Sequence, residues 1–261
     1  MNFHTLKLEA EGEIATLTLN RPEKRNAISS EMITELPQAL EEAAKSPARV
    51  LIMTGAGTAF CAGMDLEDLG ALASQSRAQH LADARRMANV FHRVYTFPKP
   101  LIAAVNGAAI AGGTGLATLA DFTLAVPGAR FGYTEVRIGF LPAVVSVFLR
   151  RQVGEKRARD LLLTGRIFDA EEARTMGLVT AIIREPEKLL ESAREFAATL
   201  ASYSPTSLLR TKRLLLRAQA REIDRDLKEA IREGAAIRTT ADFREGLASF
   251  LEKRKPKWRG E

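Results

Sequence analysis

The spacing of apolar and polar residues predicts short strands separated by helices. Apolar and polar positions alternate from Glu13 to Leu19, which is typical of a strand with one buried face. Short apolar runs bounded by turn residues predict further strands, at 49–55, 101–105, 122–126 and 177–183. After the first strand, apolar positions recur at helical spacing beyond Ser29 or Ser30, either of which can cap the helix. Pro37 should kink this helix or mark the start of a second one.

Helices dominate the rest of the pattern. The spacing from Leu81 to Phe91 predicts a helix that ends at Phe97-Pro98, and the residues before it, 67–78, are expected to form a mobile loop. Beyond residue 185 only helices are expected, at 188–200, 205–219, 222–238 and 241–253. The pattern predicts an α/β protein whose C-terminal part is entirely helical.

Composition limits the class of protein. The chain has 261 residues, of which 46% are hydrophobic and 27% are charged, as is ordinary for a soluble globular protein. Cys61 is the only cysteine, so no disulfide can form within the chain, and we expect a reducing, cytoplasmic location. We expect no association with a membrane, because no apolar run is long enough to span one. The first ten residues also lack the features of a secretion signal.

The net charge of +6 comes partly from a basic segment at residues 253–259. Such a segment can bind anionic ligands or nucleic acid, although short charged termini are more often solvated. Nucleic acid is not expected as a partner, because no aromatic residues are interleaved with the basic ones. A metal is not expected either, because no histidines, cysteines or carboxylates are clustered at metal-ligand spacing.

A glycine-rich stretch is the strongest local signal. The predicted strand 101–105 leads into Asn106-Gly107, and Gly112, Gly113 and Gly115 then open a helix that should end near Asp121. Glycine allows the backbone to approach a ligand closely, and the first N–H groups of a helix have no internal partner. By itself the stretch favours a tight turn that packs a helix on a sheet.

Three further segments accompany this stretch. They are Asn20-Arg-Pro-Glu-Lys-Arg-Asn-Ala27, Phe60-Cys-Ala-Gly-Met-Asp65 and Phe131-Gly-Tyr-Thr-Glu135. Together the four segments resemble the crotonase (enoyl-CoA hydratase/isomerase) superfamily along essentially the whole chain. The resemblance implies a spiral of ββα turns (the ClpP/crotonase fold), an acyl-CoA-binding core at 1–195 and a helical oligomerisation region at 196–261. It also implies a homotrimer, which can pair into a hexamer.

The resemblance assigns roles to individual residues. The backbone N–H groups of Met64 and Gly112 would stabilise the oxyanion of a thioester enolate, and Glu135 would act as acid and base. The implied substrate-binding residues are Lys24, Arg25, Ala27, Ala62, Asp65, Leu66, Gly113, Pro142, Phe250 and Lys253. Phe250 and Lys253 are expected to come from a neighbouring subunit. No cofactor is expected, because the coenzyme A thioester is itself the substrate.

One departure from the family pattern leaves the reaction open. Two-glutamate hydratases carry a second glutamate where this chain has Gly115. The segment after Glu135 is similar to a bacterial branch named as methylglutaconyl-CoA hydratases, which favours a hydratase-like lyase. A Δ3,Δ2-enoyl-CoA isomerase with Glu135 as the single acid and base is the alternative. Decarboxylation, or binding of acyl-CoA or RNA without catalysis, is a further alternative. Arg137 could meet a distal carboxylate of the acyl chain, or it could face away.

Overall fold

Two sheets form the centre of the computed structural model, which describes residues 3–72 and 74–260. The larger sheet has the order β1 (Leu6–Glu11), β2 (Ile14–Leu19), β3 (Val50–Gly55), β5 (Leu101–Val105), β7 (Phe122–Ala125), β10 (Ala181–Ile182). The smaller sheet has the order β4 (Ala59–Cys61), β6 (Ala108–Ile110), β8 (Arg130–Gly132), β9 (Ile167–Asp169). Neighbouring strands are parallel, except in the pairs β1–β2 and β8–β9.

The chain repeats one unit three times: a strand of the larger sheet, a strand of the smaller sheet, and helix. The first unit is β3 and β4 followed by α2 (Leu66–Leu72) and α3 (Arg77–Tyr95). The second is β5 and β6 followed by α4 (Gly112–Thr118). The third is β7 and β8 followed by the short 3₁₀ helix η2 (Glu135–Ile138) and α5 (Ala143–Val153). The α/β class and the ββα spiral are therefore confirmed.

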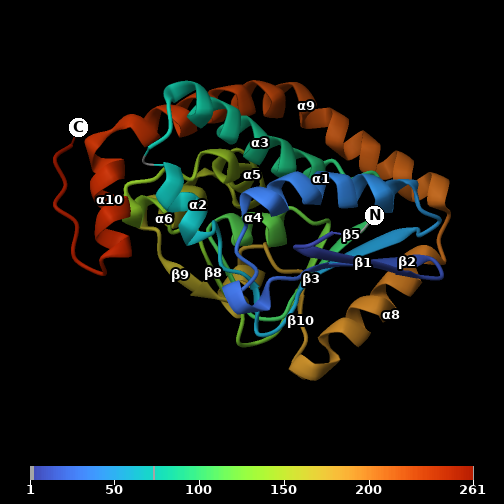
Figure 1. Ribbon diagram of the computed structural model, residues 1–261. Helices are drawn as coiled ribbons and strands as arrows, with labels where there is room; N and C mark the ends of the chain where they lie inside the picture. The colour runs from blue at the N-terminus through green and yellow to red at the C-terminus, as the bar shows by residue number, and fades with distance from the viewer. Residues whose placement is uncertain (1–2, 73, 261) are drawn as a thin grey trace.

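Helices cover both faces of the larger sheet (Figure 1). α1 (Ser30–Lys45) and α3 lie on one side, and α8 (Leu189–Ala201) packs against β2, β3, β5 and β7 on the other. This double cover explains why every residue of β3 and β5 is buried. The long helix α9 (Pro205–Ala236) crosses above α3 and α5. The remaining helices are η1 (Pro22–Lys24), α6 (Glu155–Thr164), α7 (Ala170–Thr175), η3 (Pro186–Lys188), η4 (Ile237–Thr239) and α10 (Ala241–Leu251).

Several predicted elements are confirmed. In β2, buried residues alternate with partly buried ones, as predicted for a strand with one buried face. Ser29 caps α1 by accepting a hydrogen bond from the backbone N of Met32. Only helices occur between Pro186 and Leu251, as expected. No helix in the described part of the chain is long and apolar enough to cross a membrane. The predicted boundary between residues 195 and 196 falls within α8, and the division into two regions stays a prediction.

Other predictions were wrong for identifiable reasons. Pro37 was expected to kink α1 or to mark the start of a second helix, and the second alternative is wrong because α1 continues through Pro37. The helices predicted at 205–219 and 222–238 form the single helix α9, because no residue between them interrupts its backbone hydrogen bonding. Much of the expected loop at 67–78 is helical, since α2 ends at Leu72 and α3 begins at Arg77; residue 73 lies outside the described residues. The strands of the smaller sheet were missed because three residues are too few to display a period.

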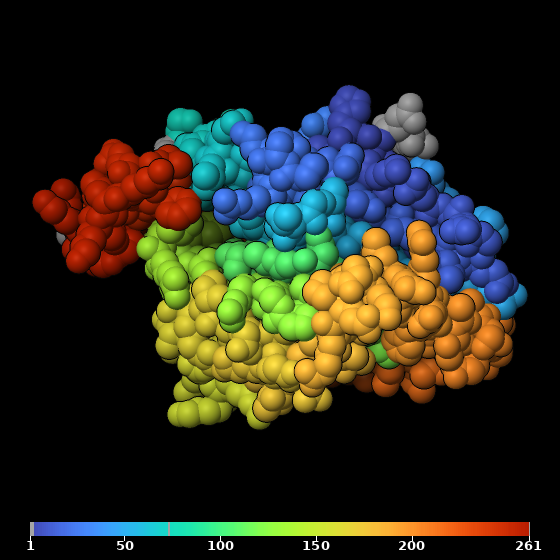
Figure 2. Space-filling view, turned by 90° about the horizontal axis from the view of Figure 1, so that it is seen from below, coloured from blue at the N-terminus to red at the C-terminus, as the bar shows by residue number. Residues whose placement is uncertain are grey.

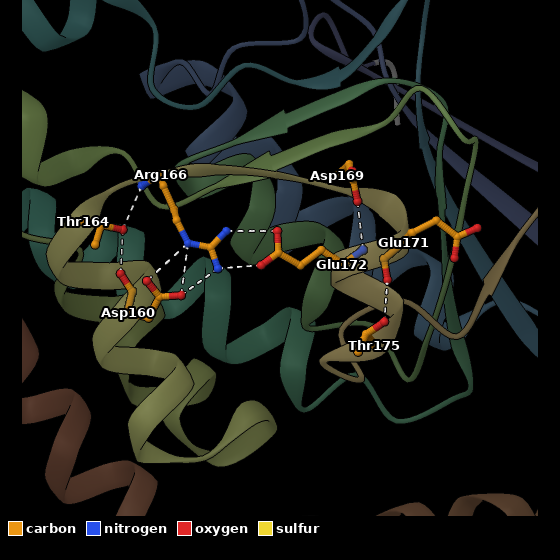
Figure 3. Close-up of polar contacts among 7 residues, drawn as sticks. All are labelled: Asp160, Thr164, Arg166, Asp169, Glu171, Glu172 and Thr175. Atoms are coloured by element: carbon orange, nitrogen blue, oxygen red, sulfur yellow. Dashed lines mark hydrogen bonds and ion pairs between the residues drawn. The ribbon is translucent and has the colours of Figure 1, made fainter.

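A partly exposed ion network holds the last strand of the smaller sheet in place (Figure 3). Arg166, just before β9, binds Asp160 of α6 and Glu172 of α7, with one Nη2–oxygen distance of 2.6 Å to each. Asp169 caps α7 by accepting a hydrogen bond from the backbone N of Glu172. Because β9 pairs with β8, this network supports the strand that leads to Glu135.

Candidate functional site

The site lies where the three parallel strands of the smaller sheet end. β4, β6 and β8 run in the same direction, so the segments that leave them meet at one edge of that sheet. Met64 follows β4, Gly112 follows β6 and Glu135 follows β8. All three residues line one cavity of about 460 Å³. The topology therefore brings together three residues that are spread over 71 positions of the sequence.

Two backbone N–H groups at this edge are free. Ile28 pairs with the segment around Met64 by donating to the carbonyl of Gly63 (2.7 Å) and accepting from Asp65 N (3.0 Å), which leaves the N–H of Met64 unused. Gly112 is the first residue of α4, where a helix provides no partner. Among the described residues, neither N–H donates a hydrogen bond. Both can therefore serve an acceptor within the cavity.

Close backbone contacts fix the position of these two groups. A Cβ on Gly63 would lie 3.0 Å from the carbonyl oxygen of Ile110, and a Cβ on Gly113 would lie 2.2 Å from that of Cys61. The exits of β4 and β6 therefore touch, and no side chain fits between them. Ala111 has a φ of 51°, a value that costs energy in a residue with a Cβ and is typical of functional turns. Gly113 serves this packing and does not line the cavity.

Glu135 is the only carboxylate among the cavity-lining residues of the described chain. The residue is only 8% exposed, and its Oε2 is buried with no hydrogen-bond partner among the described residues. Burial raises the pKa of this carboxyl to about 7, and a hydrogen bond from its own backbone N–H opposes the rise. The side chain can therefore accept a proton or release one near neutral pH.

Hydrocarbon fills the space beside Gly115. A Cβ there would lie 2.4 Å from Cε1 of Phe91 and 2.7 Å from Cγ1 of Val145. Phe91 is 1% exposed and, like Val145, forms part of the cavity wall. A second carboxylate cannot enter at this position unless the aromatic ring moves. The missing glutamate is thus replaced by an apolar wall rather than by open space.

The segments expected to bind coenzyme A lie side by side. Ala62 N donates to the carbonyl of Arg25 (3.0 Å), so the loop after β2 is paired with the loop after β4. Beneath them, Arg21 Nη1 binds Asp65 Oδ2 at 2.7 Å. The other oxygen of Asp65 accepts a hydrogen bond from Glu67 N at the start of α2. Asp65 therefore joins the two loops through its side chain.

The cavity includes some of the expected substrate-binding residues and not others. Those that line it are Ala62, Leu66, Pro142 and Phe250. Those that do not line it are Lys24, Arg25, Ala27, Asp65, Gly113 and Lys253. Lys24 instead pairs with Glu67 at the surface (2.7 Å). Phe250 lines the cavity of its own chain, and the expected contribution of Phe250 and Lys253 to the site of a neighbouring subunit stays a prediction.

The basic C-terminal segment folds back on α10, and its basic residues stay exposed, as expected of a solvated tail. Arg254 pairs with Glu245 and Glu252, and the backbone N of Lys257 donates to Glu245. Arg254 and Pro256 line the cavity. Figure 2 shows α10 and the tail standing out at one side of the molecule, and α10 contacts α2 and η2. The tail thus forms part of the wall of the site.

Three residues that shape the site were missed as site residues. Phe91 was recognised only as part of a buried helix face, and Arg21 only as part of a polar loop. Arg238, in η4, is 4% exposed and lines the cavity. No local pattern distinguishes a buried arginine from the many exposed ones of α9. Only its buried ion pair with Asp83 of α3 and its place in the cavity wall identify it.

Known proteins share this architecture along almost the whole chain. A family model described as "Enoyl-CoA hydratase/isomerase" matches residues 9–261. A Thermus thermophilus protein named "Putative enoyl-CoA hydratase" is 45% identical over 95% of this chain and 98% of its own. A 2,3-dehydroadipyl-CoA hydratase of Escherichia coli is 35% identical over 95% of each chain. The crystal structure of an enoyl-CoA hydratase/isomerase from Xanthobacter autotrophicus matches with a TM-score of 0.89 and 29% identity, over 97% of this chain and 98% of that one.

Proposed function

The chain belongs to the enoyl-CoA hydratase/isomerase family, and we propose that it adds water to the α,β double bond of an enoyl-CoA, with Glu135 carrying the proton. Relatives named as enoyl-CoA hydratases, such as those above, favour the hydratase among the reactions of this family. The observation that carries the proposal is the buried, unpaired Oε2 of Glu135 in the cavity that the two free N–H groups also line.

One carboxylate is sufficient for the proposed reaction. The ionised Glu135 takes a proton from water as the water oxygen bonds to Cβ, and the electrons of the double bond move to the thioester oxygen. The N–H groups of Met64 and Gly112 donate to that oxygen; removal of one such donor typically costs about 10²–10³ in rate. Protonated Glu135 then returns the proton to Cα as the carbonyl re-forms. The product carries the hydroxyl on Cβ and the hydrogen on Cα.

A pKa near 7 suits a group that must work in both directions. Glu135 begins as a base and becomes an acid within one turnover, so neither protonation state should be strongly favoured. Because the base form is needed first, kcat/KM should rise with pH up to about 7 and then level off. The apolar surroundings that raise this pKa also exclude bulk water, so that the interactions of the two N–H donors are strengthened.

Isomerisation of a 3-enoyl-CoA is the second candidate, and the filled space beside Gly115 favours it. Phe91 leaves no room for a second carboxylate to hold water, whereas one base can remove a proton from Cα and return it to Cγ. The two reactions are distinguished by offering 2-enoyl-CoA and 3-enoyl-CoA separately in H₂¹⁸O and following the products by mass spectrometry. Incorporation of ¹⁸O at Cβ from a 2-enoyl-CoA supports the hydratase. A shift of the double bond without hydration refutes it.

Coenzyme A is proposed to lie along the paired loops after β2 and β4. Lys24 and Arg25 supply positive charge there, and Ala62 and Leu66 line the adjoining cavity.

We also propose a homotrimer, in which Leu214 and Leu215 of α9 are covered; in the single chain they are 71% and 69% exposed. Light scattering tests the assembly, and a monomeric mass at micromolar concentration would contradict it.

A further inference from the structure

Arg238 is a buried cation in the wall of an otherwise largely apolar cavity. It lies in η4, between α9 and α10, and its side chain is 3% exposed. A guanidinium so far from water needs partners for its five N–H donors. The structure supplies partners for only some of these donors, so the unused ones indicate where a ligand can bind.

Asp83 of α3 is the only hydrogen-bond partner of Arg238 among the described residues. Nη1 binds Asp83 Oδ2 at 2.6 Å. Nε is buried without a partner, and Nη2 also donates to none of the described residues but, unlike Nε, is not sealed by neighbouring atoms. Nη2 is therefore the donor that an anion in the cavity can reach, and a charge-assisted hydrogen bond from an arginine to a carboxylate is one of the stronger kinds of hydrogen bond in proteins.

The charges around Arg238 leave it short of a counter-ion. Asp83 is shared with Arg86, which binds its other oxygen at 3.1 Å, so two guanidiniums face one carboxylate. His80 adds no negative charge that could compensate the second guanidinium. Burial and the nearby Arg238 lower its pKa, and its Nδ1 has no partner. The remaining neighbour is the ring of Phe140, whose centroid lies 5.2 Å from the guanidinium carbon. A second anion would therefore be stabilised here.

We propose that Arg238 binds a carboxylate at the distal end of the acyl chain, so that the preferred substrates are enoyl-CoA thioesters with a second, terminal acid group. This inference rests on the proposed function, since it names the substrate class of the same cavity. Phe140 connects the two regions of the cavity: it stacks on Arg238, and its backbone N donates to the carbonyl of Glu135 (3.0 Å). The thioester end of the substrate therefore meets Glu135, and the distal acid meets Arg238.

Two other arginines line the cavity but suit this role less well. Arg137 is exposed, so a carboxylate beside it would remain hydrated and gain little. Arg254 already binds two carboxylates, those of Glu245 and Glu252. Arg238 alone of the three combines burial with unused donors.

The test compares matched pairs of 2-enoyl-CoA substrates from four to eight carbons long, one of each pair ending in a methyl group and the other in a carboxylate. At the chain length that reaches Arg238, the wild-type protein should prefer the carboxylate in kcat/KM by about tenfold or more, which is the usual effect of a charge-assisted hydrogen bond. Equal values at every length, or a preference for the methyl group throughout, would overturn the inference while hydration itself stands. Absence of hydration with all substrates would instead refute the proposed function.

Variants assign the preference to a residue. Arg238→Lys keeps the charge that faces Asp83 but loses the planar guanidinium, which can bind Asp83 and the substrate acid through different nitrogens; it should lower the preference about tenfold with little change for methyl-terminated substrates. Arg238→Met combined with Asp83→Asn removes both charges, avoids leaving the aspartate unpaired, and should abolish the preference. Arg86→Met, which also touches Asp83 but does not line the cavity, is the matched control and should retain it. Loss of the preference in Arg137→Met but not in Arg238→Lys would overturn the assignment to Arg238.

Discussion

Replacing Glu135 by glutamine should abolish turnover and at the same time stabilise the protein at alkaline pH. Burial raises the pKa of Glu135 to about 7 from an ordinary value of 4.5. The folded state therefore binds this proton more tightly than the unfolded state does. The contribution is fully present below pH 4.5 and is lost as the pH rises through about 7. Glutamine does not titrate and escapes this loss.

The magnitude follows from the difference between the two pKa values. At pH 8 the ionised carboxylate destabilises the folded wild-type protein by about 3 kcal/mol, and at pH 5 by about 1 kcal/mol. The gain in unfolding free energy from Glu135→Gln should therefore grow by about 2–3 kcal/mol between pH 5 and pH 8. Loss of the proposed proton carrier should lower kcat by about 10²–10⁴, which abolishes measurable turnover, with acyl-CoA affinity changed no more than a few-fold.

The assay is urea unfolding at both pH values, followed by circular dichroism at equal protein concentration, together with kcat/KM as a function of pH. Glu35→Gln is the matched control. Burial opposes ionisation of Glu35, but hydrogen bonds from Thr5 and His4 outweigh it and lower the pKa of that carboxyl. This variant should stay active and lose stability, with a deficit that fades as the pH falls below 4.5. A stability difference for Glu135→Gln that does not change with pH, or full activity of that variant, would refute the reasoning.

Three further substitutions test the framework of the site. Gly115→Glu should destabilise the fold by about 2–3 kcal/mol, because its Cβ meets Phe91 and Val145. Adding Phe91→Ala relieves the contact with the ring, so the double variant should lose less stability in urea unfolding than the two single variants combined, and it should hydrate a short linear enoyl-CoA faster than Phe91→Ala alone. If the double variant folds but hydrates no faster, the second carboxylate is not what limits water addition. Arg21→Met should cost about 3 kcal/mol by leaving Asp65 buried without its partner, and adding Asp65→Asn should recover most of it; an equal loss in the double variant would contradict this. Arg166→Ala should cost only about 1 kcal/mol, because its ion pairs are partly exposed, and thermal unfolding measures it; unaltered stability would show that the network does not hold β9.

The sequence by itself determined the class of fold and, through resemblance, the family of the protein. The alternation in β2, the cap of α1 and the helices after residue 185 depend on neighbours along the chain, so local patterns predicted them. The motif around Glu135 and the glycines at 112 and 113 pointed to acyl-CoA chemistry through resemblance. The absence of a glutamate at position 115 could also be read directly.

Only the tertiary structure decided what surrounds those groups. The smaller sheet consists of strands too short to display a period, yet it sets the edge where Met64, Gly112 and Glu135 meet. Burial raises the pKa of Glu135, and burial is a property of the packed protein rather than of the residue. Phe91 fills the space beside Gly115, and Arg238 reaches the cavity from 103 residues beyond Glu135. Contacts at such separations leave no local pattern, because they depend on how the helices pack and not on the residues next to them in the chain.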